Sequence, residues 1–225
     1  TKYITGPGIM ADNERSFYNM ADINRAHVLM LVEENIISKD VGAELLKALN
    51  KMRQEGSAVL EMHPEYEDYY FNIEKIIIAR VGMEIGGKMH TARSRNDLGS
   101  TMLRMNVRDT LMKIIPMVYE LEKVLLHMAE ENKDTVLTGY THMQPAQPIS
   151  LAYYLIAMAE AMERDIQRLQ DALFRMNYCT LGSCAFAGTS FPVNRFSTAK
   201  RLGFTGPIHN AMDAVAARDY LQEIT

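Results

Sequence analysis

Two long segments of the chain carry apolar residues at alternating steps of four and three, a spacing that predicts long amphipathic helices. In residues 97–132 the apolar positions are Val107, Leu111, Ile114, Val118, Leu121, Leu125 and Met128. In residues 148–177 they are Leu151, Leu155, Met158, Met162, Ile166, Leu169, Leu173 and Met176. At 1.5 Å per residue the first helix would be about 54 Å long, and Pro116 is expected to kink it. Because neither helix can bury its stripe alone, we predict a coiled coil or a bundle completed by other helices, often from other subunits.

The first part of the chain has shorter periodic segments. Residues 12–37, 40–55 and about 67–81 each fit a helix, and the first two are expected to form an antiparallel pair joined by "SKD". No segment gives a convincing strand pattern, although "LGSCAFAG" could be extended. We therefore predict an all-α fold, with a small N-terminal helical domain over residues 1–95 and the first long helices of a central bundle over residues 96–225.

Composition narrows the class of protein further. The 225 residues are 48% hydrophobic with a net charge of −4, and basic and acidic residues are interspersed. Without a basic stripe or polybasic anchor, neither nucleic acid nor a membrane is an expected partner. The N-terminal "TKYITGPGIM" lacks the apolar core of a signal peptide, which predicts a cytoplasmic location.

The cysteines and histidines give no metal-binding pattern. Cys179 and Cys184 flank "TLGS", a spacing that fits neither a zinc site nor a disulfide framework, so both are expected to be buried apolar thiols. The six histidines include no pair at the i, i+4 spacing of a helical zinc site. We expect no metal and no cofactor, and we attribute the 17 methionines to adaptable core packing.

The stretch "HTARSRND", residues 90–97, concentrates polar chemistry in eight positions. Arg93 and Arg95 flank Ser94 and are followed by Asn96, which makes a good receiver for a small molecule that carries several carboxylates. The alternative is a polar loop that leads into a helix, with Asn96 or Asp97 as the N-cap. Both interpretations stay open on these residues alone.

Two further segments carry candidate chemistry. In "GYTHMQPAQP", residues 139–148, the imidazole of His142 suits proton transfer near neutral pH and Thr141 can bind a carboxylate, although a lone histidine is more often structural. The segment "GMEIGGKM" nearly matches a phosphate-binding loop. It lacks the Ser or Thr that holds magnesium, because Met89 stands there, and the preceding "IEKIIIARV" fits a helix better than a strand. Nucleotide binding is therefore not expected.

Four blocks together are more specific than any one motif. "HTARSRND", "GYTHMQPAQP", "GSCAFAGTSFPVNR" and "LGFTGPIHNAMDAVAARDYLQEI" resemble, in this order and spacing, the argininosuccinate lyase branch of the fumarase/aspartase superfamily. The resemblance implies an α-helical homotetramer with active sites shared between subunits. It also implies a C–N lyase that releases fumarate from an N-substituted aspartate, most simply argininosuccinate.

The resemblance assigns roles to particular residues. Ser94, Arg95 and Asn96, with Gln147, would bind the carboxylates of the small-molecule substrate. Thr141 and His142 would act at the reacting succinyl portion, where His142 either protonates the leaving nitrogen or orients the acid and the base. The family's "GSSxMPxKxN" loop, which carries the serine taken as the base, is not found in these 225 residues, so we expect them to be inactive on their own.

Several positions depart from the family pattern. Ala92 replaces the usual glycine of "HTGRSRND", and Tyr70 stands where "EDxHxxxE" has a histidine, while Glu74 is retained. Met20 and Asn24 stand where the family places Ser and Asp for the arginine-derived end. Another N-succinyl amine substrate, a catalytically silent structural homologue and a generic coiled-coil module remain as alternatives.

Overall fold

The structure is a computed structural model that describes residues 13–61, 63 and 69–224. The chain divides into two compact units: residues 1–107 with 177–217, and residues 108–176 with 218–225. The segment 177–217 thus belongs to the same unit as the N-terminal helices. The expected domain boundary between residues 95 and 96 stays a prediction for the whole protein.

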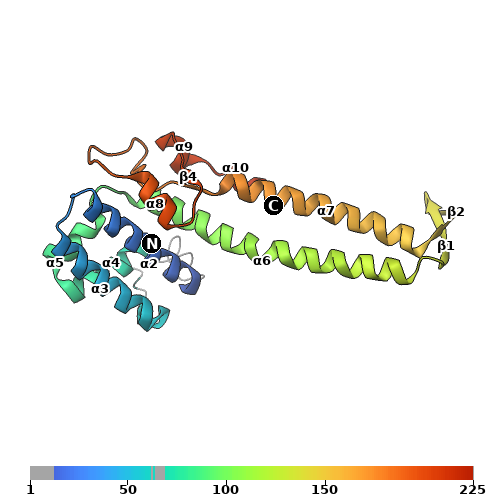
Figure 1. The fold of residues 1–225 in the computed structure, drawn as a ribbon, viewed down its shortest axis with the longest axis horizontal. Helices are drawn as coiled ribbons and strands as arrows, with labels where there is room; N and C mark the ends of the chain where they lie inside the picture. The colour runs from blue at the N-terminus through green and yellow to red at the C-terminus, as the bar shows by residue number, and fades with distance from the viewer. Residues whose placement is uncertain (1–12, 62, 64–68, 225) are drawn as a thin grey trace. The chain divides into compact units, whose positions relative to one another are not determined.

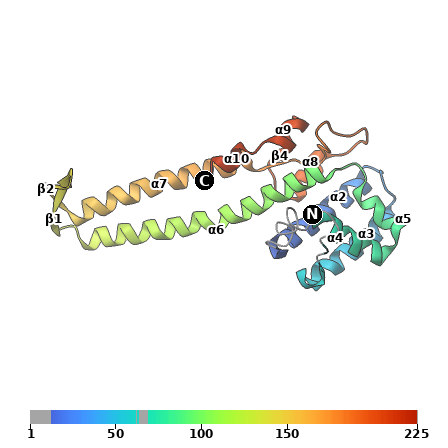
Figure 2. The same ribbon diagram turned by 180° about the vertical axis from the view of Figure 1, so that it is seen from behind.

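The N-terminal part of the first unit contains three helices: α2 (Asn13–Glu33), α3 (Lys39–Glu55) and α4 (Tyr69–Val81). They pack against one another (Figure 2), which confirms the three helices predicted from periodicity within the described residues. Helix α2 ends four residues before the predicted position. Asn35 adopts a left-handed φ of 57°, and the N–H groups of Ile36 and Ile37 turn back to the carbonyl of Leu31, which closes the helix.

Residues 82–90 connect α4 to the signature stretch through helical turns. Helix α5 (Met83–Gly86) is followed by a 3₁₀ turn, η2 (Gly87–His90), and another 3₁₀ turn, η1 (Ser57–Val59), follows α3. Because helix α4 and not a strand precedes Gly82, the strand–loop–helix context of a phosphate-binding loop is absent from this described segment. The prediction that "IEKIIIARV" is helical is confirmed.

The segment 177–217 completes the first unit. Strand β3 (Tyr178–Cys179) pairs in parallel with β4 (Gly206–Pro207), and helices α8 (Arg195–Arg201) and α9 (Ala211–Ala216) lie on either side of β4 in the chain. Helix α8 packs on α2. Side chains from both parts of the unit share one core, which includes Phe17, Ile23, Leu31, Leu45, Leu49, Ile73, Cys179, Leu181 and Phe204.

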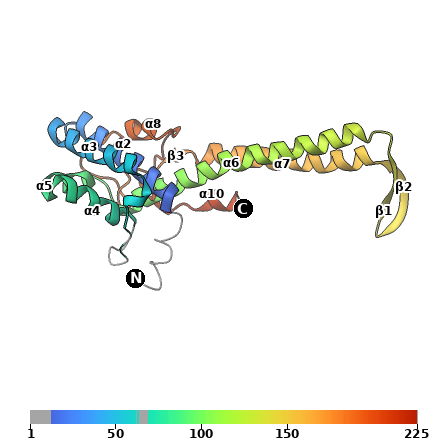
Figure 3. The ribbon, with the colours of Figure 1, turned by 90° about the horizontal axis from the view of Figure 1, so that it is seen from below.

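Helix α6 (Arg95–Glu131) is 37 residues long and continues through Pro116, which confirms the predicted rod. In the second unit α6 and α7 (Leu151–Met176) run side by side in opposite directions (Figures 1 and 3). The short helix α10 (Asp219–Gln222) contacts α7, and Arg175 Nε donates to both carboxylate oxygens of Glu223 at 3.1 Å.

None of the helices in the described part of the chain has the length and hydropathy needed to cross a membrane.

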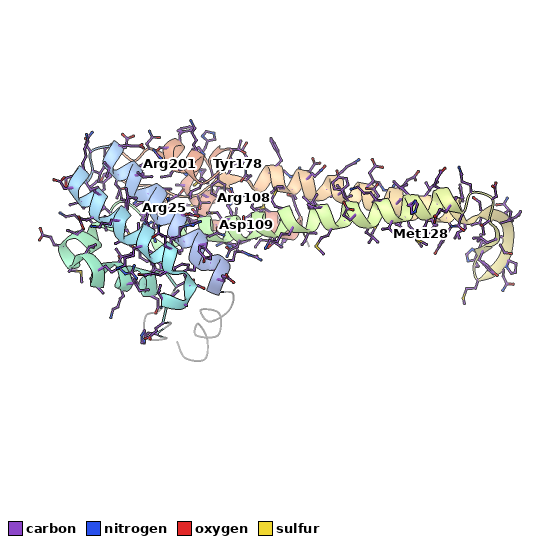
Figure 4. The ribbon with its side chains drawn as sticks, turned by 60° about the horizontal axis from the view of Figure 1, so that its bottom comes forward. Arg25, Arg108, Asp109, Met128, Tyr178 and Arg201 are labelled. Carbon is purple, nitrogen blue, oxygen red and sulfur yellow. The ribbon has the colours of Figure 1, made fainter. Side chains whose placement is uncertain are left out.

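The apolar stripe of α6 is only partly the one predicted. Leu111, Ile115 and Ala129 are buried in the second unit, whereas Ile114, Leu121 and Met128 from the predicted stripe are 39%, 49% and 42% exposed. Figure 4 shows Met128 near the end of α6 that leads to β1. The stripe of α7 is confirmed except at Met158, which is 41% exposed. A helix that is apolar on more than one face is suited to burial in a larger bundle.

The expectation that the chain has no strands is wrong at the short strands β3 and β4 and, over a longer stretch, for residues 136–150. Strands β1 (Val136–Thr141) and β2 (Gln144–Ser150) form an antiparallel hairpin at the end of the two long helices (Figure 3). Its two-residue turn is His142-Met143, with φ of 47° and 62°. Such turns normally carry Asn-Gly, so the sequence gives no hairpin signal here. The prolines in β2 also argue against a strand, because proline has no backbone N–H to donate to a neighbouring strand.

Candidate substrate site and its anchor

The signature residues Ser94, Arg95 and Asn96 form the turn from which α6 begins. Ser94 Oγ accepts a hydrogen bond from the backbone N–H of Asn96 at 3.3 Å, as a residue at a helix start commonly does. Arg95 and Asn96 are exposed, and Ser94 is half-buried. The Arg95 guanidinium lies 5.0 Å from the ring centroid of Phe71, so an aromatic face supports the cation. This turn can offer a guanidinium, a hydroxyl and an amide to a carboxylate ligand.

Asp97, which no candidate site included, anchors this turn. Its carboxylate is fully buried and accepts three backbone N–H groups: Ser94 to Oδ1 at 3.0 Å, Gly182 to Oδ2 at 2.8 Å and Cys184 to Oδ2 at 2.9 Å. Burial raises the pKa of Asp97 above its usual value, and the three N–H bonds oppose that shift because they favour the ionised form. The interpretation of Asn96 or Asp97 as the N-cap is wrong, because α6 begins at Arg95 and Ser94 is the residue before it. Asp97 lies in the first turn of α6: its Oδ1 reaches back to the N–H of Ser94, and its Oδ2 binds a turn far along the chain.

The backbone on both sides is tied by further bonds. Thr180 Oγ1 donates to the carbonyl oxygen of Asp97 at 2.9 Å, and Asn96 Nδ2 donates to the carbonyl of Ala185 at 3.2 Å. The half-buried thiol of Cys184 donates to the carbonyl of Ala92 at 3.4 Å. Burial raises the pKa of this thiol to about 11, so it remains protonated near neutral pH. Cys184 therefore has a hydrogen-bonding role that the prediction of two buried apolar thiols missed.

The two arginines of the signature, Arg93 and Arg95, differ in burial. Arg93 is buried, with 6% of its surface exposed, and its Nη2 donates to Asn24 Oδ1 at 2.5 Å and to the Tyr70 hydroxyl at 3.3 Å. Tyr70 in turn donates to Glu74 Oε1 at 2.9 Å. The idea that both guanidiniums of the motif face a ligand is therefore corrected: Arg95 is exposed, whereas Arg93 holds the motif to α2 and α4.

His27 lies in the same buried region. Its Nε2 donates to the carbonyl of Thr91 at 2.8 Å. Burial lowers the pKa of His27 well below 6.5, and the nearby charge of Arg93 lowers it further, so the imidazole is neutral. Burial likewise raises the pKa of Tyr70. These side chains fix the backbone before the signature turn instead of contacting solvent.

The departures from the family pattern fall in this region. Met20 and Asn24 lie on α2 and are 1% and 0% exposed. Asn24 is engaged through its oxygen by Arg93, while its Nδ2 has no hydrogen-bond partner among the described residues. Met20 belongs to the apolar core. The neighbourhood of Arg93 thus differs chemically from a site with a carboxylate at position 24.

Thr141, His142 and Gln147 lie in the second unit, on the β1–β2 hairpin. All three are exposed, and His142 occupies the first turn position. Thr141 and Gln147 line a cleft of about 590 Å³ together with Leu137, Tyr140, Ile149 and Tyr154. His142 is not among the cleft residues. The six predicted residues therefore form two groups, one in each compact unit.

Comparison with known proteins places the chain in a family. Residues 9–225 match the model of the lyase family, so the chain belongs to this family of lyases. It is 41% identical over 217 residues to argininosuccinate lyase 1 of Shouchella clausii (strain KSM-K16), covering 96% of this chain and 44% of that protein. It is 44% identical over 216 residues to argininosuccinate lyase of Natronomonas pharaonis, covering 96% of this chain and 43% of that protein. The resemblance inferred from the signature blocks is confirmed.

Solved structures give the same architecture. The chain superposes on EDDS lyase in complex with formate with a TM-score of 0.87 and 33% identity, covering 99% of this chain and 44% of that one. It superposes on class II fumarase from Schistosoma mansoni with a TM-score of 0.78 and 18% identity, covering 93% of this chain and 52% of that one, a likeness of fold alone. The predicted all-α fold class is confirmed, with the small hairpin as an addition.

Proposed function

We propose that this chain carries the carboxylate-binding part of a carbon–nitrogen lyase that converts argininosuccinate to arginine and fumarate. The observation that carries the proposal is the turn of Ser94, Arg95 and Asn96, which presents three carboxylate-binding groups on a buried anchor. Argininosuccinate lyases 41% and 44% identical to this chain support the substrate. The chain spans about two fifths of the length of these relatives, so the activity is proposed for the full-length protein.

The proposed reaction is an anti elimination. A base removes a proton from the carbon next to a carboxylate, the negative charge spreads into that carboxylate, and the C–N bond then breaks to release fumarate and an amine. A preorganised guanidinium and hydrogen-bond donors lower the barrier most when they surround the carboxylate on which charge develops. Arg95, Ser94 and Asn96 are suited to this task, and the base is expected outside these 225 residues.

Thr141 and His142 are proposed to act on the succinyl portion, with Gln147 binding substrate. Thr141 offers a hydroxyl to a carboxylate, and His142 an imidazole for proton transfer to the leaving nitrogen. We further propose a homotetramer with shared sites and a cytoplasmic location. The apolar side chains exposed on α6 and α7, among them Met117 at 70% and Leu121 at 49%, support burial by further helices.

A second candidate substrate class is another N-substituted aspartate. Asn24 and Tyr70 engage the buried Arg93, and Met20 joins the core, so the region where the family would receive the arginine-derived end is altered. The likeness to EDDS lyase, at 33% identity, supports a related lyase with a substrate other than argininosuccinate. A catalytically silent homologue is the remaining alternative.

The test is release of fumarate, followed by its absorbance, from the full-length protein. We expect turnover of argininosuccinate, and a fall of about tenfold to a hundredfold in kcat/KM for Arg95→Lys, because an ammonium cannot replace the bidentate guanidinium. Arg25→Lys, on α2, is the matched control and should change kcat/KM less than about twofold, because Arg25 forms only a half-exposed ion pair with Asp22.

The outcomes separate the three candidates. Turnover of another N-succinyl amine, but not of argininosuccinate, would support the second candidate. Absence of fumarate from every substrate offered would support the silent homologue. The 225 residues alone, assayed beside the full-length protein, test the prediction that they have no activity without the base.

A further inference from the structure

Two turns far apart in the sequence meet at one buried carboxylate. Ser94, which opens α6, and the turn containing Gly182 and Cys184 all donate backbone N–H groups to Asp97. Gly182 lies 85 positions from Asp97 along the chain. Both turns belong to the same compact unit, so the junction is a property of that unit.

Each carboxylate oxygen of Asp97 binds a different turn. Oδ1 holds the turn that carries Ser94, Arg95 and Asn96, and Oδ2 holds the turn 180–185. A fully buried ionised group is costly unless its hydrogen bonds are made, and here three charge-assisted N–H bonds offset that cost. An uncharged residue of the same shape cannot replace it, because asparagine has one accepting oxygen where aspartate has two.

The turn 180–185 itself requires special backbone geometry. Gly182 has a φ of 86°, and a Cβ there would lie 2.8 Å from Arg195 Cγ. Cys184 also has a positive φ, 54°, although it is not glycine. Residues are kept in such conformations only where the surroundings hold them. The N–H bonds to Asp97 and the thiol bond to Ala92 provide that restraint.

The restraint reaches a proposed substrate-binding side chain. Asn96 Nδ2 donates to the carbonyl of Ala185, one residue beyond Cys184. The orientation of the Asn96 amide therefore depends on where the turn 180–185 lies. Its position is set in turn by Oδ2 of Asp97 and by the Thr180 hydroxyl, which donates to the Asp97 carbonyl.

We propose that Asp97 is a positioning residue of the lyase site, which locks the turn 94–96 to the turn 180–185 so that Asn96 and its neighbours present one fixed surface to a substrate carboxylate. This inference rests on the proposed function. Asp97 does not itself contact the substrate, because its carboxylate is buried and occupied by backbone N–H groups. It acts through the orientation of Ser94 and Asn96.

The decisive variant is Asp97→Asn in the full-length protein. The new NH₂ group must face either the Ser94 N–H or the N–H groups of Gly182 and Cys184, so one turn is released while the volume is unchanged. We expect the inhibition constant for fumarate to rise by about tenfold, because the released turn loses its hydrogen bonds to residue 97 and the bonds that remain lose their charge assistance, with a larger fall in kcat/KM than in kcat. Asp22→Asn, which removes the acceptor of Arg25 and Arg53 on the same unit, is the matched control and should leave fumarate binding within about twofold.

A second pair of variants keeps the proposal testable if Asp97→Asn does not fold. Thr180→Val removes the hydroxyl that donates to the Asp97 carbonyl, and Thr180→Ser restores it. We expect Thr180→Val to weaken fumarate binding by about threefold to tenfold and Thr180→Ser to recover most of the loss, because valine removes one neutral hydrogen bond and serine restores its donor. Equal fumarate binding in wild type, Asp97→Asn and Thr180→Val would overturn the proposal.

Amide hydrogen exchange separates this proposal from the proposed function. In Asp97→Asn we expect faster exchange at Ser94, or at Gly182 and Cys184 together, with unchanged exchange in α3. Unchanged exchange at all three amides would overturn the coupling even in an active enzyme. If the wild type neither releases nor binds fumarate, the proposed function fails, and the role of Asp97 at a lyase site fails with it. Faster exchange in Asp97→Asn would in that case show only that Asp97 links the two turns.

Discussion

The guanidinium of Arg93 lies over the ring of Tyr70, 5.1 Å from its centroid, and also donates to the Tyr70 hydroxyl at 3.3 Å. Arg93 is thereby held by both the face and the edge of one aromatic side chain. The same hydroxyl donates to Glu74, so Tyr70 lies between a buried cation and a carboxylate. This arrangement fixes the backbone that leads into the signature turn.

Tyr70→Phe should destabilise the protein. The ring and its contact with Arg93 remain, but the hydroxyl that serves Arg93 and Glu74 is lost. We expect a loss of about 1–3 kcal/mol in the free energy of unfolding, measured by urea titration, because hydrogen bonds to charged groups are among the stronger ones. Tyr119→Phe removes a hydroxyl that accepts from Gln170 on an exposed surface, and should cost less than about 0.5 kcal/mol. Equal effects of the two variants would contradict this interpretation.

Ala92→Gly should stabilise the protein. Ala92 has a φ of 60°, in the left-handed region where a Cβ is unfavourable, and glycine removes that strain. We expect a gain of about 1 kcal/mol, seen as a higher thermal midpoint. The opposite sign is expected for Ala161→Gly, at an exposed position inside α7, where glycine costs about 1 kcal/mol. A destabilised Ala92→Gly variant would contradict the interpretation that the backbone at Ala92 is strained.

His27 should make stability depend on pH. Its pKa is lowered in the folded protein from 6.5, so below about pH 6.5 the unfolded chain binds the proton that the folded chain rejects. Stability should therefore fall as the pH falls below about 6.5, by up to about 1.4 kcal/mol per pH unit for this one group. His27→Gln keeps a donor for the Thr91 carbonyl and has no such proton.

The measurement is urea unfolding of both proteins between pH 7.5 and pH 5.5. The wild type should lose more stability than His27→Gln over this range, and the difference between the two curves isolates His27 from the other titrating groups. Parallel curves would show that the imidazole has a similar pKa in the folded and unfolded states.

Gly139→Ala should disrupt the hairpin that carries Thr141 and His142. A Cβ at position 139 would lie 2.8 Å from the carbonyl oxygen of Gln147, where the register of the hairpin shifts. We expect faster amide exchange across β1 and β2 and, in the full-length protein, a fall in fumarate release. Gly99→Ala, on α6 where a Cβ meets nothing within 4 Å, should instead raise stability by about 1 kcal/mol. Unchanged exchange in the hairpin of Gly139→Ala would contradict the prediction.

The helices could be predicted because their signal is local. Apolar spacing defined α3 and most of the stripe of α7, since residues three and four apart share a helix face whatever surrounds the helix. The same rule was incomplete for α6, which is apolar on several faces. Choosing between Ile114 and Ile115 as the buried residue requires knowing where α7 lies.

The hairpin could not be predicted, because its turn lacks the residues that normally permit positive φ. His142 and Met143 carry no turn signal, and Pro145 and Pro148 argue against a strand. The burial of the signature residues could not be predicted either. Nothing in "HTARSRND" distinguishes Arg93, which is buried, from Arg95, which is exposed.

The sequence by itself determined the helical class, the family and the segment that carries Ser94, Arg95 and Asn96, because spacing and motif are written along the chain. Only the tertiary structure decided that Asp97 anchors that segment and that Gly182 and Cys184 share its carboxylate. The physical reason is that a buried charge must find its hydrogen bonds wherever the fold supplies them. Here the fold supplies two of the three from the turn 180–185, far along the chain from Asp97.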